Sequence, residues 1–282
     1  MNTQTRSSEL AANALTILAS ALEAGDSQAL TKYLSVMSRF RAYSWNNCLL
    51  ISLQRPTATR VAGFHTWLKL GRHVRKGEKG IAILAPVLFR PANSQQQEAE
   101  ADQPSSFPLQ RVVAFRTAYV FDVAQTEGEI LPEFASVNGD PAEKIDSLKA
   151  FVCSRGILLD YDSGIAPALG VSRGGSITLL PGLAAAQEFS TLAHECAHEL
   201  LHRNERRPQT NKTIRETEAE AVAFVVCQAI GLDTNTAAAD YIKLYNGDKA
   251  TLSNSLQFIQ STAIDMLTAL GVDANPVPGE EA

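Results

Sequence analysis

Leucines recur three and four positions apart in the first part of the chain. This spacing, seen over residues 9–22 and 29–40, predicts two amphipathic helices. A third helix is predicted to begin at Trp45, with Ser44 as its N-cap, and to stop before Pro56. The front of the chain is therefore expected to be helical.

The next part of the chain predicts a short helix and β-strands. Residues 64–70 predict one more short helix that ends at a glycine, and the β-type runs over 81–89 and 112–121 predict two paired strands. Residues 91–107 between them are almost wholly polar, so we expect a flexible hairpin insertion. These elements predict helices combined with an antiparallel sheet.

The back of the chain is mostly helical. Residues 127–140 lack periodicity and contain turn residues, and the length alone suggests about two domains, so we predict domains over 1–130 and 140–282. The elements predicted for the second domain are two short strands at 157–161 and 176–180, and helices over 142–153, 187–203, 213–230, 237–245 and 252–270. The predicted fold class is α+β.

Composition excludes several classes of protein. Of 282 residues, 45% are apolar and 20% charged, which excludes wholesale disorder and coiled coil. Glu9 and Glu23 interrupt the apolar stretch at the start, so neither a signal peptide nor a membrane span fits, and we expect a cytoplasmic protein without a membrane partner. Without a C-x-x-C pair, free and mostly buried thiols are expected at Cys48, Cys153, Cys196 and Cys227.

The clearest chemical signal is a histidine cluster in the nonapeptide His194-Glu-Cys-Ala-His198-Glu-Leu-Leu-His202. Residues four apart lie on one helix face, near enough for His194 and His198 to hold one zinc ion. Glu195 then lies beside the metal, where it can take a proton from a zinc-bound water and pass it to a leaving amine. The pattern predicts a Zn²⁺ site and a metallopeptidase-like, zincin-like domain.

A zinc site needs a third protein ligand. His202 lies eight residues from His194, about 12 Å along the helix axis, so we place it behind the ligands or on the surface. The metzincin subclass is excluded, because Leu201 and Asn204 stand where it needs glycine and histidine. The third ligand must come from elsewhere.

The acid-rich segment that follows is the better source. We predict Glu216 as the ligand and Glu220, one turn later, as the residue that orients a ligand histidine, although the two roles could be exchanged. Ala219 and Ala223 share their face and would allow close approach of the histidine helix. Glu218 points about 200° away from Glu216 and is expected in solvent.

Two further hypotheses concern the C-terminal half of the chain. The stretch 172–180, read as one strand, could offer an edge to an extended peptide just before the site. Alternatively, the metal only stabilises a binding module that has no turnover, in which case its removal lowers stability and leaves the affinity for the binding partner nearly unchanged.

Charge is distributed unevenly. The net charge is −5, yet residues 39–90 hold ten basic side chains and one acid, which gives +9 there and −14 elsewhere. Cations with interleaved aromatic rings are typical of single-stranded nucleic-acid binding, although a basic segment can be a solvated face and tryptophans are often core residues. The candidate DNA-binding residues are Tyr43, Trp45, Asn46, Asn47, Arg55, Arg60, Trp67, Lys69, Arg72, Arg75, Lys76 and Lys79.

At these residues the chain resembles the ArdC-type antirestriction proteins of conjugative plasmids. The resemblance lies in the stretches SWNNCLLISLQRPTATRVAGFHTWLKLGRHVRKGEKGIAIL, VFDVAQTEGEILP, and TLAHECAHELLH followed by ETEAEAVAFVVC. It implies an N-terminal domain that binds single-stranded DNA and a C-terminal domain similar to a zinc metallopeptidase, whose metal motif matches His194, Glu195, His198 and Glu216. The polar insertion after Pro91 is a departure that affects neither site.

The resemblance implies a protein that shields incoming plasmid DNA from host restriction. The alternative is a zinc metalloendopeptidase that cleaves a regulator or a restriction protein, with the basic domain only recruiting it to DNA. Glu195, in the position of a general base, is the feature that motivates this alternative.

Overall fold

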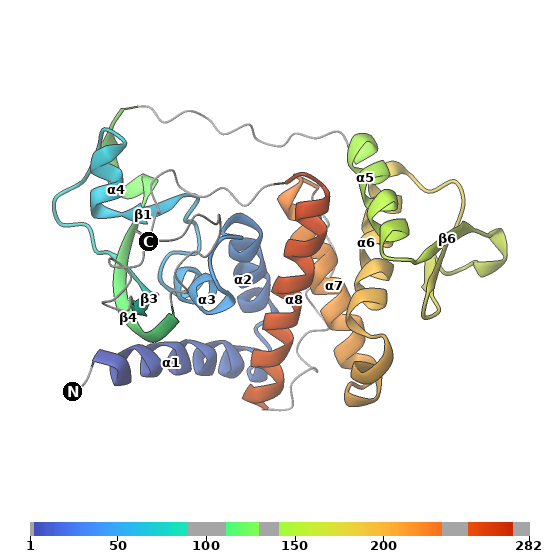
Figure 1. The fold of residues 1–282 in the computed structure, drawn as a ribbon, viewed down its shortest axis with the longest axis horizontal. Helices are drawn as coiled ribbons and strands as arrows, with labels where there is room; N and C mark the ends of the chain where they lie inside the picture. The colour runs from blue at the N-terminus through green and yellow to red at the C-terminus, as the bar shows by residue number, and fades with distance from the viewer. Residues whose placement is uncertain (1–2, 90–110, 130–140, 233–247, 273–282) are drawn as a thin grey trace, which may run out of the picture.

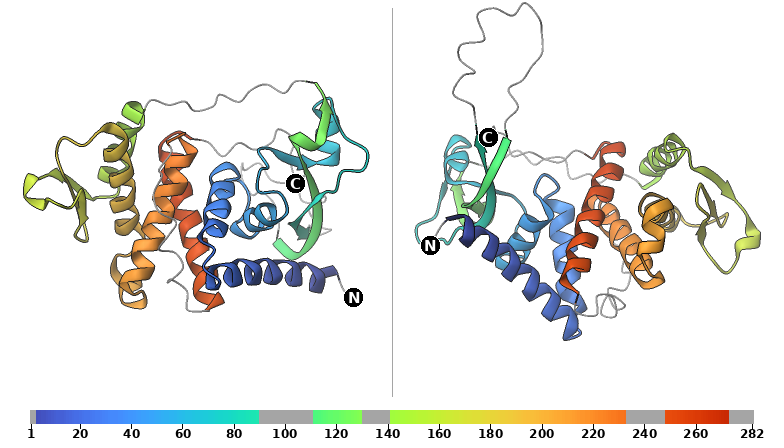
Figure 2. Two further views of the ribbon diagram at one scale, coloured as in Figure 1. Left: turned by 180° about the vertical axis from the view of Figure 1, so that it is seen from behind. Right: turned by 60° about the horizontal axis from the view of Figure 1, so that its bottom comes forward.

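The computed structural model describes residues 3–89, 111–129, 141–232 and 248–272. Helices α2, α7 and α8 lie in the middle of the molecule, with the sheet that contains β3 and β4 at one end and the small sheet that contains β6 at the other (Figure 1). The two further views of Figure 2 agree with this arrangement. Among the described helices, none is both long enough and apolar enough to cross a membrane.

Helices form where the sequence predicts them in the front of the chain. They are α1 (Thr3–Glu23), α2 (Ser27–Arg39), α3 (Trp45–Gln54) and α4 (Phe64–Lys69). The Ser44 side chain accepts a hydrogen bond from the backbone N–H of Asn47, so the predicted N-cap of α3 is confirmed. The first helix is longer than its leucine pattern and begins at Thr3.

The predicted strand pair is confirmed within an antiparallel sheet of order β1-β4-β3. Its strands are β1 (Val61–Gly63), β3 (Ile81–Phe89) and β4 (Arg111–Asp122). A second pair, β2 (Arg72–Val74) with β5 (Thr126–Gly128), escaped prediction because three-residue strands are too short to show an alternating pattern. The predicted insertion over 91–107 lies outside the described residues.

The free edge of β3 is covered by two side-chain amides of α3. Asn47 donates to the carbonyl of Leu84 at 2.9 Å and accepts from its N–H at 2.8 Å. Gln54, two turns later, exchanges the same pair of bonds with Ala82, both at 2.9 Å. Each amide takes the place of a neighbouring strand's peptide group, so the helix closes an edge that could otherwise pair with another chain.

The back half combines helices with a small mixed sheet. Its elements are α5 (Pro141–Ser154), β6 (Leu158–Tyr161), β7 (Gly170–Ser172), β8 (Ser176–Leu179), α6 (Ala185–Leu201), the 3₁₀ helix η4 (Asn204–Gln209), α7 (Lys212–Ala229) and α8 (Lys249–Ala269). In the sheet, β8 is central, parallel to β6 and antiparallel to β7. The α+β class is confirmed. The predicted helix over 237–245 and most of the predicted domain boundary lie outside the described residues.

The prediction of one strand over 172–180 with a free edge is wrong. Gly174 and Gly175, with φ of +72° and +117°, turn the chain between β7 and β8, and both β8 edges are paired. Both glycine N–H groups donate to the carboxylate of Glu199 at 2.7 Å. The turn is therefore fixed to α6, and among the strands that the structure describes, the unpaired sheet edge beside that helix belongs to β7.

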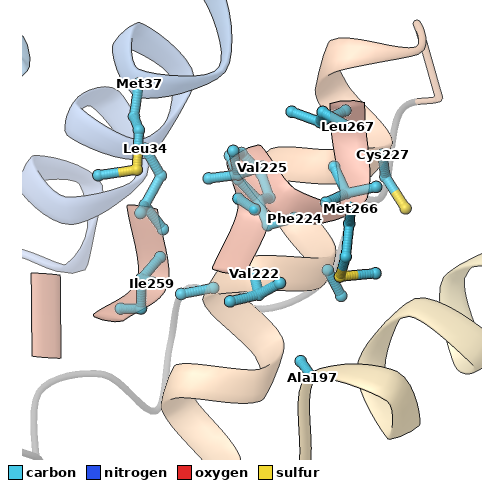
Figure 3. Packing of buried hydrophobic residues seen from close by; sticks show 14 of the residues in the cluster. Leu34, Met37, Ala197, Val222, Phe224, Val225, Cys227, Ile259, Met266 and Leu267 are labelled. Atoms are coloured by element: carbon cyan, nitrogen blue, oxygen red, sulfur yellow. The ribbon is translucent and has the colours of Figure 1, made fainter. Parts of the chain in front are cut away.

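One hydrophobic core spans both halves of the chain. Leu34 and Met37 of α2 face Val222 and Val225 of α7, with Ile259 of α8 beside them (Figure 3). All five side chains are at most 1% exposed. Removing α7 or α8 would therefore expose apolar surface of the front half.

The Asn47 contact generates a test of the fold. Asn47→Ala leaves the N–H and the carbonyl of Leu84 unpaired, so the free energy of unfolding should fall by roughly 1–3 kcal/mol. Asn46→Ala, at the adjacent and more exposed position of the same helix, is the matched control. Urea unfolding followed by circular dichroism measures both, and equal stability of the two variants would contradict the role given to the amide.

Candidate metal centre and basic surface

Two helices bring three ligand atoms together. His194 and His198, one turn apart on α6, have their Nε2 atoms 3.1 Å from each other. The Oε2 atom of Glu216, on α7, lies 3.7 Å from the first and 3.5 Å from the second. Ligands about 2.1 Å from one tetrahedral metal ion are about 3.4 Å apart, so these three side chains can hold a divalent cation.

Small residues allow this approach. Ala193 and Ala197 on α6 and Ala219 and Ala223 on α7 are buried, and the two helices pack along each other. The close contact predicted from the alanines of the second helix is therefore present. A larger side chain at these positions would push Glu216 away from the histidines.

Glu220 lies where it can orient the first histidine. Its Oε2 atom is 3.2 Å from Nδ1 of His194, which leaves Nε2 of that ring directed at the cluster. Burial disfavours the charged imidazole, but hydrogen bonds to Glu216 and Glu220 outweigh it and raise the pKa of His194 to about 9. Hydrogen bonds from the two histidines lower the pKa of Glu216, so this carboxylate is ionised.

The second histidine is supported by a chain of buried groups. Nδ1 of His198 is 3.2 Å from Nδ1 of His202, and Nε2 of His202 is 2.9 Å from Glu218. A ligand nitrogen at Nε2 puts the His198 proton on Nδ1, which then donates to His202; the proton of His202 is left on Nε2, where it donates to Glu218. Each tautomer follows from the one before it.

The expectation that Glu218 lies in solvent is wrong. Its side chain is 0% exposed, and the Arg206 guanidinium donates to both of its oxygens at 2.7 Å. Ser255 of α8 donates to the same carboxylate at 2.5 Å. Burial opposes ionisation, but the hydrogen bonds from His202, Arg206 and Ser255 outweigh it and lower the pKa of Glu218.

Glu195 borders a pocket of about 480 Å³ next to the cluster. Gly170 of β7 packs closely against Glu195. A Cβ atom on Gly170 would lie 2.8 Å from Cγ of Glu195 and 2.7 Å from Cγ2 of Thr191. The free edge of β7 thus runs beside the predicted general base. The other lining residues are Leu169, Ala186, Gln187, Ser190, His194, Glu220 and Leu232.

The basic residues of the front half separate into two groups. Lys69, Arg75, Lys76 and Lys79 are exposed. Arg72 is half-buried, and its guanidinium donates hydrogen bonds to Thr126 and to the carbonyl of Glu129. The remaining candidates for DNA contact are half-buried, and they are Tyr43, Trp45, Asn46, Arg55 and Arg60.

Two predicted DNA-binding residues lie in the interior. Trp67 is 0% exposed, and its indole N–H donates to the carbonyl of Phe121 at 2.8 Å, so its ring cannot stack on a base. Asn47 is 7% exposed and is paired with β3. Both are corrections to the sequence prediction. The expectation of free and mostly buried thiols is confirmed: all four cysteines are free, and of these Cys153 is exposed.

Glu218 provides a sharp test of this network. Glu218→Ala leaves Arg206 and His202 buried without their carboxylate and should cost roughly 3–5 kcal/mol of unfolding free energy. Glu205→Ala, an exposed acid nearby in the sequence, should change it by less than about 0.5 kcal/mol. Because folding lowers the pKa of Glu218, its contribution is present above the ordinary glutamate pKa and lost as pH falls below it.

Thermal unfolding at neutral and acidic pH measures both effects. The stability of the wild type should fall more steeply with acid than that of Glu218→Gln, which cannot ionise. Parallel curves would contradict the charged state assigned to Glu218.

Comparison with known proteins places the front half in a family. Residues 12–121 match the family described as the N-terminal domain of anti-restriction factor ArdC. The chain is also 25% identical, over an alignment of 279 residues, to an uncharacterized protein of Bacillus anthracis, pXO2-81. That alignment covers 83% of this chain and 46% of the relative, so the chain spans about half the relative's length.

Two solved structures share the fold. The metal-free crystal structure of the antirestriction ArdC protein from the R388 plasmid is 19% identical, with a TM-score of 0.54 over 85% of this chain and 97% of that one. The Mn(II)-bound structure of the same protein is also 19% identical, with a TM-score of 0.52 over 84% of this chain and 97% of that one. The family match over residues 12–121 supports the predicted resemblance to the ArdC-type antirestriction proteins, and the two solved structures show that the fold is shared over most of the chain.

Proposed function

We propose that this protein binds single-stranded DNA through its front half and protects incoming plasmid DNA from host restriction. The observation that carries the proposal is the match of residues 12–121 to the ArdC N-terminal domain, because that range contains the whole +9 segment. Four exposed cations of this segment, Lys69, Arg75, Lys76 and Lys79, are available for phosphates. The proposed division assigns residues 1–130 to DNA and residues 140–282 to the metal.

The second part of the proposal is a zinc centre held by His194, His198 and Glu216. Separations of 3.1–3.7 Å between the ligand atoms support it, as does the donor set of two imidazoles and one carboxylate. The Mn(II)-bound structure of the R388 protein also favours a divalent cation. Glu220 is proposed to orient His194, and His202 with Glu218 to orient His198.

A specific observation favours peptidase chemistry as the second candidate function. The pocket of about 480 Å³ beside the cluster has a free strand edge, β7, on which an extended peptide can pair. Zinc held by His194, His198 and Glu216 would supply a water of lowered pKa and would polarise a peptide carbonyl. Glu195 would be the residue that accepts a proton and returns it to the leaving amine. The substrate would be a regulator or a restriction protein.

Metal affinity separates the two glutamates of α7. If Glu216 is the ligand, Glu216→Gln should weaken zinc binding by more than about 100-fold, whereas Glu220→Gln, which acts through His194, should weaken it by about 10–100-fold. His73→Ala, an exposed histidine of β2, is the control. Competition with a chromogenic chelator measures all three, and the reverse order of the glutamates would exchange their roles.

Protection of DNA tests the function itself. The purified chain should bind oligo-dT with an affinity that falls steeply with sodium chloride, with a slope of about −3 in log–log form for four phosphate contacts. Cells that express it should retain more unmethylated plasmid than cells with Lys76→Ala/Lys79→Ala. A flat salt dependence would contradict phosphate recognition.

Glu195→Gln decides between the two candidate functions in the same assay. This variant keeps the metal ligands and removes the proton-transfer group. Full protection by Glu195→Gln means that DNA binding carries the function, and loss of protection with unchanged oligo-dT affinity means that hydrolysis does.

A further inference from the structure

The outward face of the front sheet carries a row of exposed aromatic and apolar side chains. On β4, Phe115 and Tyr119 are 50% and 56% exposed, whereas Val120, next to Tyr119, is 4% exposed. Successive residues of a strand point to opposite faces, and the register is regular from Ala114 onward, so Phe115 and Tyr119 share one face. Large exposed rings in a row commonly mark a contact surface.

The register extends this face across the sheet. Phe115 lies opposite the exposed Pro86 of β3, and Tyr119 lies opposite Ala82. At the base of the strand, Phe121 packs edge-to-face on Phe64 of α4 with ring centroids 6.4 Å apart, and Phe64 is itself 45% exposed. The aromatic row therefore runs from Phe64 along β4.

A basic pocket adjoins the row at Tyr119. A Cβ atom on Gly80 would lie 3.0 Å from Cβ of Tyr119, and Gly80 also lines a pocket of about 510 Å³ with Arg55 and Lys79. Nε of Arg55 is buried 3.5 Å from the carboxylate of Asp122, whereas the side chain as a whole is 32% exposed. The exposed part of Arg55 is therefore what a ligand of the pocket can reach.

The acid of this pocket is already neutralised. Glu78 accepts from Arg75 at 2.9 Å and from the Gln125 amide at 3.0 Å. Gln125 also donates to the carbonyl of Lys79 at 2.8 Å, which fixes the loop. The pocket therefore presents Arg55 and Lys79 to an anion in a fixed arrangement.

We propose that the outward face of β3 and β4 is a base-stacking platform for single-stranded DNA, with Tyr119 and Phe115 as the stacking residues. The pocket formed by Arg55 and Lys79 takes a backbone phosphate at one end of the row. Planar rings beside a cationic pocket suit a ligand that has flat apolar faces and a repeating negative charge. The inference rests on the proposed DNA binding and replaces Trp67, which is buried, as a source of stacking.

The test uses the full chain and two labelled strands, oligo-dT and an abasic strand of equal length. Phe115→Ala and Tyr119→Ala should each weaken oligo-dT binding by about 5- to 150-fold with an unchanged salt slope. Tyr119→Phe should retain wild-type affinity, as should Leu158→Ala, an exposed apolar residue of β6. On the abasic strand the alanine variants and the wild type should be equal.

The charged residues give the complementary result. Lys79→Ala should weaken binding to both strands and reduce the salt slope by about 0.7. If the aromatic variants bind oligo-dT like the wild type while Lys79→Ala does not, the platform is refuted and the proposed DNA binding stands. If the wild type binds neither strand, the proposed function itself has failed.

Discussion

The close packing of α6 on α7 determines the geometry of the candidate metal centre. The two histidines come from one helix and the carboxylate from the other, so their separations of 3.1–3.7 Å depend on how near the helix axes lie. Alanines at the facing positions allow that approach. The same contact places Glu220 against His194 and Glu218 against His202, because both acids belong to the same stretch of α7. A single helix pair thus sets the ligands and the groups behind them.

The sequence predicted this centre better than it predicted its surroundings. The spacing of the histidines and of Glu216 with Glu220 could be read directly, since residues one turn apart share a helix face. The burial of Glu218 could not be predicted in this way. A helical wheel assumes one buried and one solvated face, but α7 is packed by α6, α8 and α2, and is enclosed on several sides. The partners of Glu218, Arg206 and Ser255, come from η4 and α8, and no local pattern links them to it.

In the front half, too, local patterns predicted the elements but not which side chains are buried. Helix and strand positions followed from leucine spacing, the Ser44 cap and runs of β-type residues. Composition then identified aromatic residues near cations without showing which rings face outward. Trp67 lies inside because α4 packs on the sheet, and its N–H is satisfied by the carbonyl of Phe121. The alternation of Phe115, Thr117, Tyr119 and Phe121 was the signal for an outward row, and it gains meaning only once the core face of β4 is known.

Helix α8 connects the two halves more tightly than the chain order suggests. Ser255 donates to Glu218 behind the candidate metal ligands, while Gln260, five residues later, donates to the carbonyl of Tyr43 just before α3 at 2.8 Å. Between and beyond them, Ile259 and Met266 fill the core shared with α2 and α7. A fragment cut near residue 135 would lose these contacts, so its behaviour would report lost packing as well as lost chemistry. Point substitutions on exposed groups, which leave this core intact, are therefore the proper way to assign DNA binding and metal chemistry to their residues.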